Sequence, residues 1–383
     1  MRTSSLALLV ALAPTVPGCT ADLPDLGTPE PGSGGGGLET TAPWSLEPFE
    51  IRVPLAGTGP VWLARDPVGG TCIGAETDGV PVVVRLDVDG VLDPAFADGV
   101  PVPALAGLSG VSARPDGACV AAGVDATGRI AATALLSNGQ PDPNFATEVG
   151  RPGALDATAM ADGGIGLMAF EHSTTRVLRL LPDGRADLGF GVSGEAALPV
   201  AGAADLAASP EGSVTVAAGW SIVRLDPFGR EDPSFGEAGW LELDLLFGSV
   251  SLSLLAFAEN DSVWLVAEEF VAGGRVVHGR IADTGSHLLS PAQLAVPAGD
   301  RLLALVPPFA VGYHSDGRCT SPTVYRFADD SIAFDLTFGD AGVWRLPAAS
   351  CDAAASAAAV EADGTVLVAG WDGGVVVHRF TPE

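Results

Sequence analysis

The chain has 383 residues, of which 47% are hydrophobic and 17% are charged, so it can bury a large core and is not disordered as a whole. Its 47 acidic residues outnumber its 19 basic residues, which are all arginine, and the net charge is −28. Such a surface repels phosphate backbones and acidic lipid headgroups, which excludes nucleic-acid binding and argues against docking on a membrane by charge alone.

The first residues have the features of a secretory leader. Arg2 precedes an apolar run over residues 6–13, which is too short to span a bilayer but suits the hydrophobic part of a leader. The next segment, "VPGC" at 16–19, resembles a bacterial lipobox, with an aliphatic residue three positions before the cysteine and a small residue just before it. We therefore expect a lipoprotein leader over 1–18 and a lipid on Cys19. Ordinary secretion, with Cys19 incidental, is the alternative.

Residues 19–48 are rich in Pro, Gly and Ser and show no apolar period, which predicts a flexible tether. A lipid anchor followed by a tether suits a domain held at a membrane surface. Thr20 follows the cysteine where a retention signal would place Asp, which favours the outer membrane under the familiar Gram-negative sorting rule. The sequence thus predicts a lipid-anchored protein of the bacterial cell envelope.

The rest of the chain, 49–383, repeats one phrase, seen in "RLDPFGREDPSFGEAGW" at 224–240. An arginine stands five residues before a turn glycine at the end of a β-rich run. Ser331 replaces the glycine in one unit, and Ala134 replaces the arginine in another. The repeat predicts seven units of about 48 residues each. The arginines are Arg85, Arg179, Arg224, Arg280, Arg326 and Arg379.

Each unit is predicted to contain four short strands. In the second unit we expect strands at 100–107, 110–115, 118–123 and 129–136, because Asp-Gly and Asn-Gly pairs between them tolerate the positive φ of tight turns. Seven such units predict an all-β, seven-bladed β-propeller of four-stranded antiparallel blades, with six or eight blades as alternatives. Strand candidates at 49–56 and 375–380 predict a ring that closes without a swapped strand.

The link that follows the last strand of a unit carries the pattern Asp-x-x-Phe. We expect the phenylalanine to plug the space between blades, where burying it contributes about 2 kcal/mol. The aspartate is expected to accept turn amides or to pair with the strand arginine. The pairs are Asp93/Phe96, Asp142/Phe145, Asp187/Phe190, Asp232/Phe235 and Asp335/Phe338.

These phrases, of the form "RLxxDGxLDxxFGxxG" followed by "DGxxxVAG", resemble the delta-60 repeat, which forms propellers in bacterial secreted and surface proteins. The resemblance extends over almost all of 49–383. The family carries no established catalytic residues, so it implies no catalytic site here.

We find no motif for catalysis, metal binding or a cofactor. The five histidines are scattered with no pair at metal-ligand spacing, and each is expected to be structural. Asp87, Asp89 and Asp93 faintly resemble a calcium loop, but the further oxygen ligands and the closing Glu are missing, so we interpret them as turn residues. The histidines are His172, His278, His287, His314 and His378.

Four cysteines follow Cys19, and an even number in an exported protein predicts disulfides. Cys319 and Cys351 stand in loops that leave the same face of neighbouring units, so we expect them to pair. Cys72 and Cys119 occupy equivalent places in units one and two; a bridge between them requires that equivalent positions lie close enough.

Loops on one face repeat poorly, notably 171–176, 268–275, 313–323 and 346–362, and variable loops on repeat scaffolds carry binding sites. We therefore expect a monomeric binding module or scaffold, with a protein or glycan partner on that face near units five to seven. The first alternative is a lactonase-like or other hydrolase that uses the central channel, which would need acids or histidines converging on the axis. The second is a purely structural envelope protein.

Overall fold

The computed structural model describes residues 44–382 with short gaps. The gaps are 54, 56–58, 67, 97–98, 146–147, 154–155, 172, 201–202, 219–220, 243–249, 258–261, 270–274, 282–287, 293–298, 329–332, 349 and 362. The chain divides into two units, Met1–Thr40 and Thr41–Glu383, and all the described residues belong to the second. The expected leader, Cys19 and most of the tether therefore lie outside the described residues. The described part contains no helix long and apolar enough to cross a membrane.

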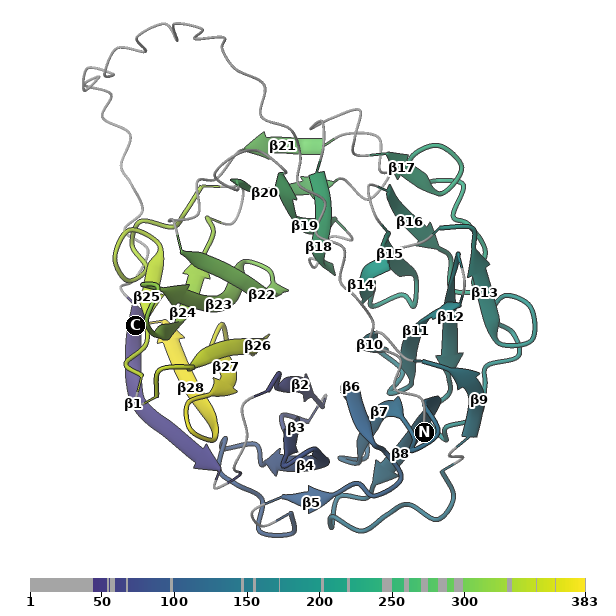
Figure 1. Cartoon of the computed structure of the whole chain (residues 1–383), viewed down its shortest axis with the longest axis horizontal. Helices are drawn as coiled ribbons and strands as arrows, with labels where there is room; N and C mark the ends of the chain where they lie inside the picture. The colour runs from purple at the N-terminus through teal and green to yellow at the C-terminus, as the bar shows by residue number, and fades with distance from the viewer. Residues whose placement is uncertain are drawn as a thin grey trace, which may run out of the picture. The chain divides into compact units, whose positions relative to one another are not determined.

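The described strands form seven four-stranded antiparallel sheets, which surround a central axis as the blades of a β-propeller (Figure 1). The predicted fold class and the count of seven blades are confirmed. We number the blades 1 to 7 from the strand β2 onward. Within blades 1 to 6 the strands follow in chain order from the axis to the rim.

The strand bounds fall into seven groups. Blade 1 contains β2 (Trp62–Arg65), β3 (Thr71–Thr77), β4 (Val80–Leu86) and β5 (Val100–Pro101). Blade 2 contains β6 (Gly107–Ala113), β7 (Cys119–Val124), β8 (Arg129–Leu135) and β9 (Glu148–Pro152). Blade 3 contains β10 (Asp156–Ala159), β11 (Ile165–Glu171), β12 (Thr174–Leu180) and β13 (Glu195–Leu198). Blades 4 and 5 contain β14 (Ala203–Ala208), β15 (Val214–Ala218), β16 (Ser221–Leu225) and β17 (Trp240–Glu242); and β18 (Val250–Phe257), β19 (Val263–Glu269), β20 (Arg275–Ile281) and β21 (Leu288–Ala292). Blade 6 contains β22 (Asp300–Val306), β23 (Phe309–Ser315), β24 (Thr320–Arg326) and β25 (Val343–Arg345). Blade 7 contains β26 (Ala354–Val360), β27 (Val366–Trp371), β28 (Val375–Pro382) and, from the start of the chain, β1 (Trp44–Val53).

The predicted phase of the repeat is wrong by one strand. The segment expected to open unit two at 100–107 contains β5, which pairs with β4 as the rim strand of blade 1, and only then reaches β6. The physical reason is the short link: the Asp93 amide donates to the Arg85 carbonyl at 2.8 Å, so the chain folds back onto the strand it has just left. The longer segment that follows, 102–106, returns the chain toward the axis.

The closure of the ring also differs from the prediction. β1 pairs antiparallel with β28, so the N-terminal strand supplies the rim of the last blade and the expectation of closure without a swapped strand is wrong. The shifted phase explains this result, because β28 is the third strand of its blade and needs a partner on the rim side. β1 begins at Trp44, so residues 44–48 belong to this strand and not to the predicted tether.

The core lies between the blades, where each of the five Asp-x-x-Phe phenylalanines is at most 6% exposed. Phe96 packs among residues of blades 1 and 2, and Phe145 packs among residues of blades 2 and 3. Phe190 lies in the same way between blades 3 and 4, and Phe235 between blades 4 and 5. These four rings occupy the places where plugs between blades were expected.

Phe338 also lies between blades, as expected, and three further aromatic rings join it there. It is fully buried between blades 6 and 7, but its ring centroid lies 5.8 Å from those of Phe309 in blade 6 and Phe380 in blade 7. Trp344 of β25 joins this group, also at 5.8 Å. Phe338 therefore plugs this space together with Phe309, Trp344 and Phe380, which belong to strands whose packing the repeat does not specify.

The link after blade 5 lacks the Asp-x-x-Phe motif, and other aromatic residues replace it. Trp264 of blade 5 and Tyr325 and Phe327 of blade 6 pack together between these two blades. All the motif phenylalanines, Phe145 and Phe338 included, are thus core residues, and none of them lines the axial cavity described below.

Both cysteine pairs form disulfides, Cys72–Cys119 between blades 1 and 2 and Cys319–Cys351 between blades 6 and 7. The Cα atoms of Cys72 and Cys119 are 5.7 Å apart, which is within disulfide range. Equivalent positions on neighbouring blades are therefore close enough at this radius. Disulfides of this kind are typical of proteins outside the reducing cytosol.

The two disulfides should differ in their reduction under native conditions. Cys72 and Cys119 are fully buried, whereas Cys351 is exposed and Cys319 is partly exposed. We expect dithiothreitol without denaturant to reduce Cys319–Cys351 faster by roughly tenfold or more, because a thiolate must reach the sulfur it attacks. Alkylation followed by peptide mass spectrometry measures each rate. Equal rates would show that the fold does not protect the inner pair.

Candidate ligand-binding site in the propeller channel

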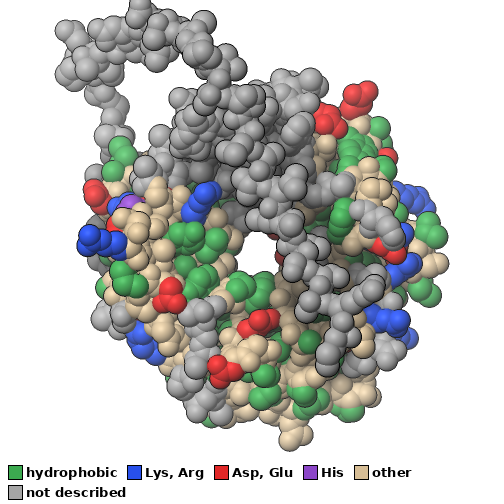
Figure 2. Space-filling view, in the orientation of Figure 1, with side chains coloured by type: hydrophobic (Ala, Val, Ile, Leu, Met, Phe, Trp, Pro, Cys, Tyr) green, Lys and Arg blue, Asp and Glu red, His purple; other side chains and the backbone are tan. Residues whose placement is uncertain are grey.

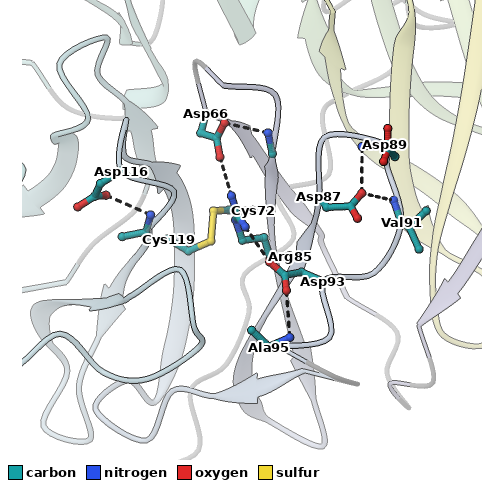
Figure 3. A network of polar contacts seen from close by, with 12 residues as sticks. Asp66, Cys72, Arg85, Asp87, Asp89, Val91, Asp93, Ala95, Asp116 and Cys119 are labelled. Atoms are coloured by element: carbon teal, nitrogen blue, oxygen red, sulfur yellow. Dashed lines mark hydrogen bonds and ion pairs between the residues drawn. A yellow bond between two sulfur atoms is a disulfide. The ribbon is translucent and has the colours of Figure 1, made fainter.

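Arginines and aspartates pair at the turns of blades 1, 2, 3 and 6. The Arg85 guanidinium donates to Asp93 at 2.7 Å and to the fully buried Asp66 carboxylate at 3.0 Å (Figure 3). The other oxygen of Asp93 accepts the Ala95 amide at 3.0 Å. Both expected roles of the aspartate, accepting turn amides and pairing with arginine, therefore occur together in blade 1. These contacts join the turns of the blade, and we interpret the residues as structural.

The same arrangement recurs with local variation. Arg179 pairs with Asp162 at 2.8 Å and with Asp187 at 3.5 Å, and Arg326 pairs with Asp335. In blade 2, where Ala134 replaces the strand arginine, Arg114 reaches Asp142 at 3.0 Å from the preceding hairpin. This substitute was not predicted, because Arg114 belongs to a different strand of the blade.

The arginines of blades 4 and 7 show other contacts. The Arg224 guanidinium lies 4.5 Å from the centre of the Phe235 ring, while Asp232 accepts the amide and hydroxyl of Ser234. A pairing of Arg224 with Asp232 stays a prediction. Arg379 pairs with Glu361 at 3.6 Å, and the side chain of Arg280 lies outside the described residues.

The histidines and the calcium-like turn form no metal site within the described part of the chain. His172, His287 and the side chain of His278 lie outside it, and His378 is buried in β28. One Asp87 oxygen accepts the amides of Asp89 and Val91, both at 3.0 Å, which is the geometry of a turn. His314 belongs to a polar cluster in blade 6, described below.

A cavity of about 570 Å³ opens on the axis of the propeller, where the space-filling view shows a hole between the blades (Figure 2). Its described lining comes from the innermost strands β2, β6, β10, β14, β22 and β26 and from the segments beside them. Trp62, Trp371 and several aliphatic side chains form most of this wall. The volume and the apolar lining are those of a small-molecule site.

Two acidic residues interrupt the apolar wall of the cavity. Asp156 and Asp205 occupy equivalent positions in β10 and β14, opposite Met168 and Ala217 of the next strands. Because the innermost strands converge on the axis, the two carboxyl groups meet and hydrogen-bond to each other. Both also accept the Leu206 amide, at 2.9 Å each.

Burial in the wall raises the pKa of Asp156, although the hydrogen bonds from Asp205, Ala157 and Leu206 oppose this shift. Two carboxyl groups in contact cannot both ionise without strong repulsion. After the first proton leaves, the pair therefore shares the remaining proton until the pH is raised further. The pair can donate one hydrogen bond and accept several. This is the chemistry needed to hold a hydroxyl-bearing ligand or to transfer a proton.

The pair should make stability fall as the pH rises. A folded-state pKa above the unfolded value means that the folded chain binds more protons between the two values, so stability is lost as pH increases through that window. We expect Asp156→Asn to flatten this decline and to raise the melting temperature at pH 8 relative to the native chain. Thermal unfolding of both proteins from pH 4 to 8 checks this. Parallel curves for the two proteins would show that Asp156 is not responsible.

Sequence reasoning missed the acid pair, although a signal was present. Aligned on their hairpin turns, the innermost strands of blades 2, 3 and 4 place Gly110, Asp156 and Asp205 at the same position. Comparing that position across the repeats identifies two neighbouring acids that point to one place.

No model of a known protein family matches the sequence, and no curated protein matches it either. The structure is similar to solved propellers at low sequence identity. Virginiamycin B lyase from Staphylococcus aureus is 12% identical with a TM-score of 0.57, covering 88% of this chain and 99% of the other. A streptogramin B lyase is 14% identical with a TM-score of 0.59, covering 88% and 98%. A chain of the mitotic checkpoint complex is 9% identical with a TM-score of 0.53, covering 92% and 97%. These likenesses show the fold alone.

Proposed function

We propose that the chain is a lipid-anchored β-propeller of the bacterial cell envelope, and that its axial cavity binds a small ligand or the end of a glycan chain. The observation that carries the binding proposal is the cavity of about 570 Å³, whose lining includes two tryptophans from blades 1 and 7 and a carboxyl pair from blades 3 and 4. The lipobox-like segment at Cys19 and the tether support the anchor, and the two disulfides support an oxidising compartment. The repeat wording supports membership of the delta-60 repeat family.

The anchor is tested apart from the ligand. We expect the native protein to sediment with outer membranes and to incorporate labelled palmitate, and Cys19→Ala to lose both the label and the membrane association. A native protein that stays soluble in the periplasm, or that is secreted without a lipid, would exclude the anchor and leave the propeller's binding role open.

A glycan suits the chemistry of the cavity better than a protein does. Aromatic rings present flat apolar faces to the C–H groups of a sugar, and carboxyl groups accept hydrogen bonds from its hydroxyls. The volume of about 570 Å³ is large enough for one or two sugar units and too small for a folded partner. A protein partner would have to use the variable loops, such as 313–323.

Glycan-array binding of the purified propeller tests the site directly, using two matched tryptophan variants. Ala159→Trp places a large side chain in the cavity at an exposed position of its wall, and Ala95→Trp places one at an exposed position on a link between strands. We expect binding to neutral glycans that Ala159→Trp reduces by roughly tenfold or more, a loss of about 1.4 kcal/mol or more, and that Ala95→Trp leaves unchanged. Equal binding by the two variants would place the site elsewhere.

The acid pair favours a second candidate, an enzyme that uses the channel for hydrolysis. One carboxylate could take a proton from water while the other carboxylic acid protonates the leaving group, as general acid–base catalysis requires. The similar folds include two lyases, so propellers of this shape can carry chemistry, although fold does not decide function. Turnover of a lactone or glycoside that Asp156→Asn abolishes while ligand binding persists would favour the enzyme over the binding module.

A further inference from the structure

A second polar cluster crosses the four strands of blade 6, away from the channel acids. Asp300 begins β22 and its carboxylate is fully buried. One oxygen contacts Nδ1 of His314 on β23, and the other accepts the hydroxyl of Tyr325 on β24. The Arg345 guanidinium on β25 lies 3.6 Å from that second oxygen. One buried carboxylate therefore gathers three side chains from three neighbouring strands.

The protonation pattern of the cluster follows from these contacts. Burial and the neighbouring Asp300 strongly raise the pKa of Tyr325, so its hydroxyl keeps its proton and donates to the carboxylate. The contact of His314 Nδ1 with Asp300 favours the tautomer with its proton on Nδ1. Asp300 therefore engages Nδ1 and leaves Nε2 as the ring nitrogen that can contact a ligand, and the side chain of His314 is 29% exposed.

Arg345 differs from the arginines that stabilise the blades. Arg85 and Arg114 are mostly buried and hydrogen-bond to carboxylates at 2.6–3.0 Å, whereas Arg345 is 41% exposed and makes only its longer ion pair within the described residues. Its remaining N–H groups, like Nε2 of His314, have no partner in that part of the chain. A planar guanidinium with free donors is suited to bidentate binding of a carboxylate.

We propose that this cluster binds a small hydroxy acid, with the ligand's carboxylate on Arg345 and a hydroxyl hydrogen-bonded to Nε2 of His314. Asp300 positions both groups by holding them through its two oxygens. The net charge of −28 repels long polyanions, which limits the ligand to one carrying a single carboxylate, such as a sugar acid. The proposal concerns a different site from the channel and does not depend on the binding function proposed there.

Calorimetric titration of the purified propeller with sodium D-glucuronate tests the proposal, with D-glucose and sodium acetate as probes that each lack one of the two groups. We expect saturable glucuronate binding and no binding of glucose. Acetate should bind more weakly by roughly tenfold or more, because it has no hydroxyl to hydrogen-bond with His314. We expect Arg345→Gln and His314→Phe each to weaken glucuronate binding by roughly tenfold or more.

The matched control is Arg185→Gln, which removes the guanidinium of another exposed arginine, 72% exposed, from blade 3. It should bind glucuronate as the native chain does. Circular dichroism of each variant confirms that it is folded, and the exposure of Arg345 makes its replacement the safer of the two. Absence of saturable glucuronate binding by the folded native protein, or unchanged binding in folded Arg345→Gln, would overturn the proposal.

Discussion

Phe190→Ala should lower the free energy of unfolding by about 3–5 kcal/mol, the cost of removing a fully buried aromatic ring and leaving a cavity. Phe190 is 0% exposed and packs between blades 3 and 4 with Met168, Val177 and Val216. The backbone of the next blade packs directly against the ring at Gly229, where even a Cβ atom would lie only 2.9 Å from it. Chemical unfolding monitored by tryptophan fluorescence measures the loss.

The matched control for this variant is Leu188→Ala, two residues earlier in the same link. Leu188 is 73% exposed, so we expect its truncation to change stability by less than about 0.5 kcal/mol. A small effect of Phe190→Ala, or effects of equal size in the two variants, would contradict the role of the Asp-x-x-Phe phenylalanines as plugs between blades.

Arg85→Ala should lower the free energy of unfolding by a comparable amount, about 3–5 kcal/mol, since it leaves a buried carboxylate without its cation. The Asp66 side chain is fully buried in the turn between β2 and β3, and Arg85 joins it to Asp93 in the link between β4 and β5. The hydrogen bonds and charges of both aspartates raise the pKa of Arg85 despite its partial burial, so the guanidinium remains charged.

An exposed arginine pair provides the comparison for Arg85. Arg185 contacts Asp183 at 2.6 Å, but its side chain is 72% exposed, and solvent screening reduces the value of such pairs. We expect Arg185→Ala to have little effect in the same denaturant series. If Arg85→Ala unfolds at the same denaturant concentration as the native chain, the repeated arginine does not stabilise the blade.

The repeat made most of the architecture predictable. A sequence motif that recurs about every 48 residues, with Asp-Gly turns between β-rich runs, is consistent with few folds. The number of blades follows from counting how often the arginine position of the motif recurs. The disulfide of Cys319 with Cys351 was predictable because both residues stand in loops of the same face. These are local patterns, and each lies within one or two units.

The strand phase and the closure were not predictable by the same reasoning. Unit boundaries drawn at the arginine are arbitrary within a repeat, because the pattern is the same whichever strand is taken as the first. Only the hydrogen bond between the Asp93 amide and the Arg85 carbonyl decides that the next strand belongs to the blade just left. The pairing of β1 with β28 joins residues more than 300 positions apart, and no local pattern specifies it.

The candidate sites were harder to predict than the fold because they depend on positions that do not repeat. Asp156 and Asp205 are adjacent only through the convergence of two inner strands on the axis. His314 was interpreted as an isolated strand histidine, and its partners Asp300, Tyr325 and Arg345 come from three other strands. The conspicuous repeated residues proved to be the structural ones.

The glycan-array comparison of the native propeller, Ala159→Trp and Ala95→Trp tests most directly whether the axial cavity is the binding site. The account predicts that the native protein and Ala95→Trp bind the same neutral glycans and that Ala159→Trp loses them, with all three proteins equally folded. Glycan binding that survives Ala159→Trp, or no glycan binding by the native protein, would contradict it.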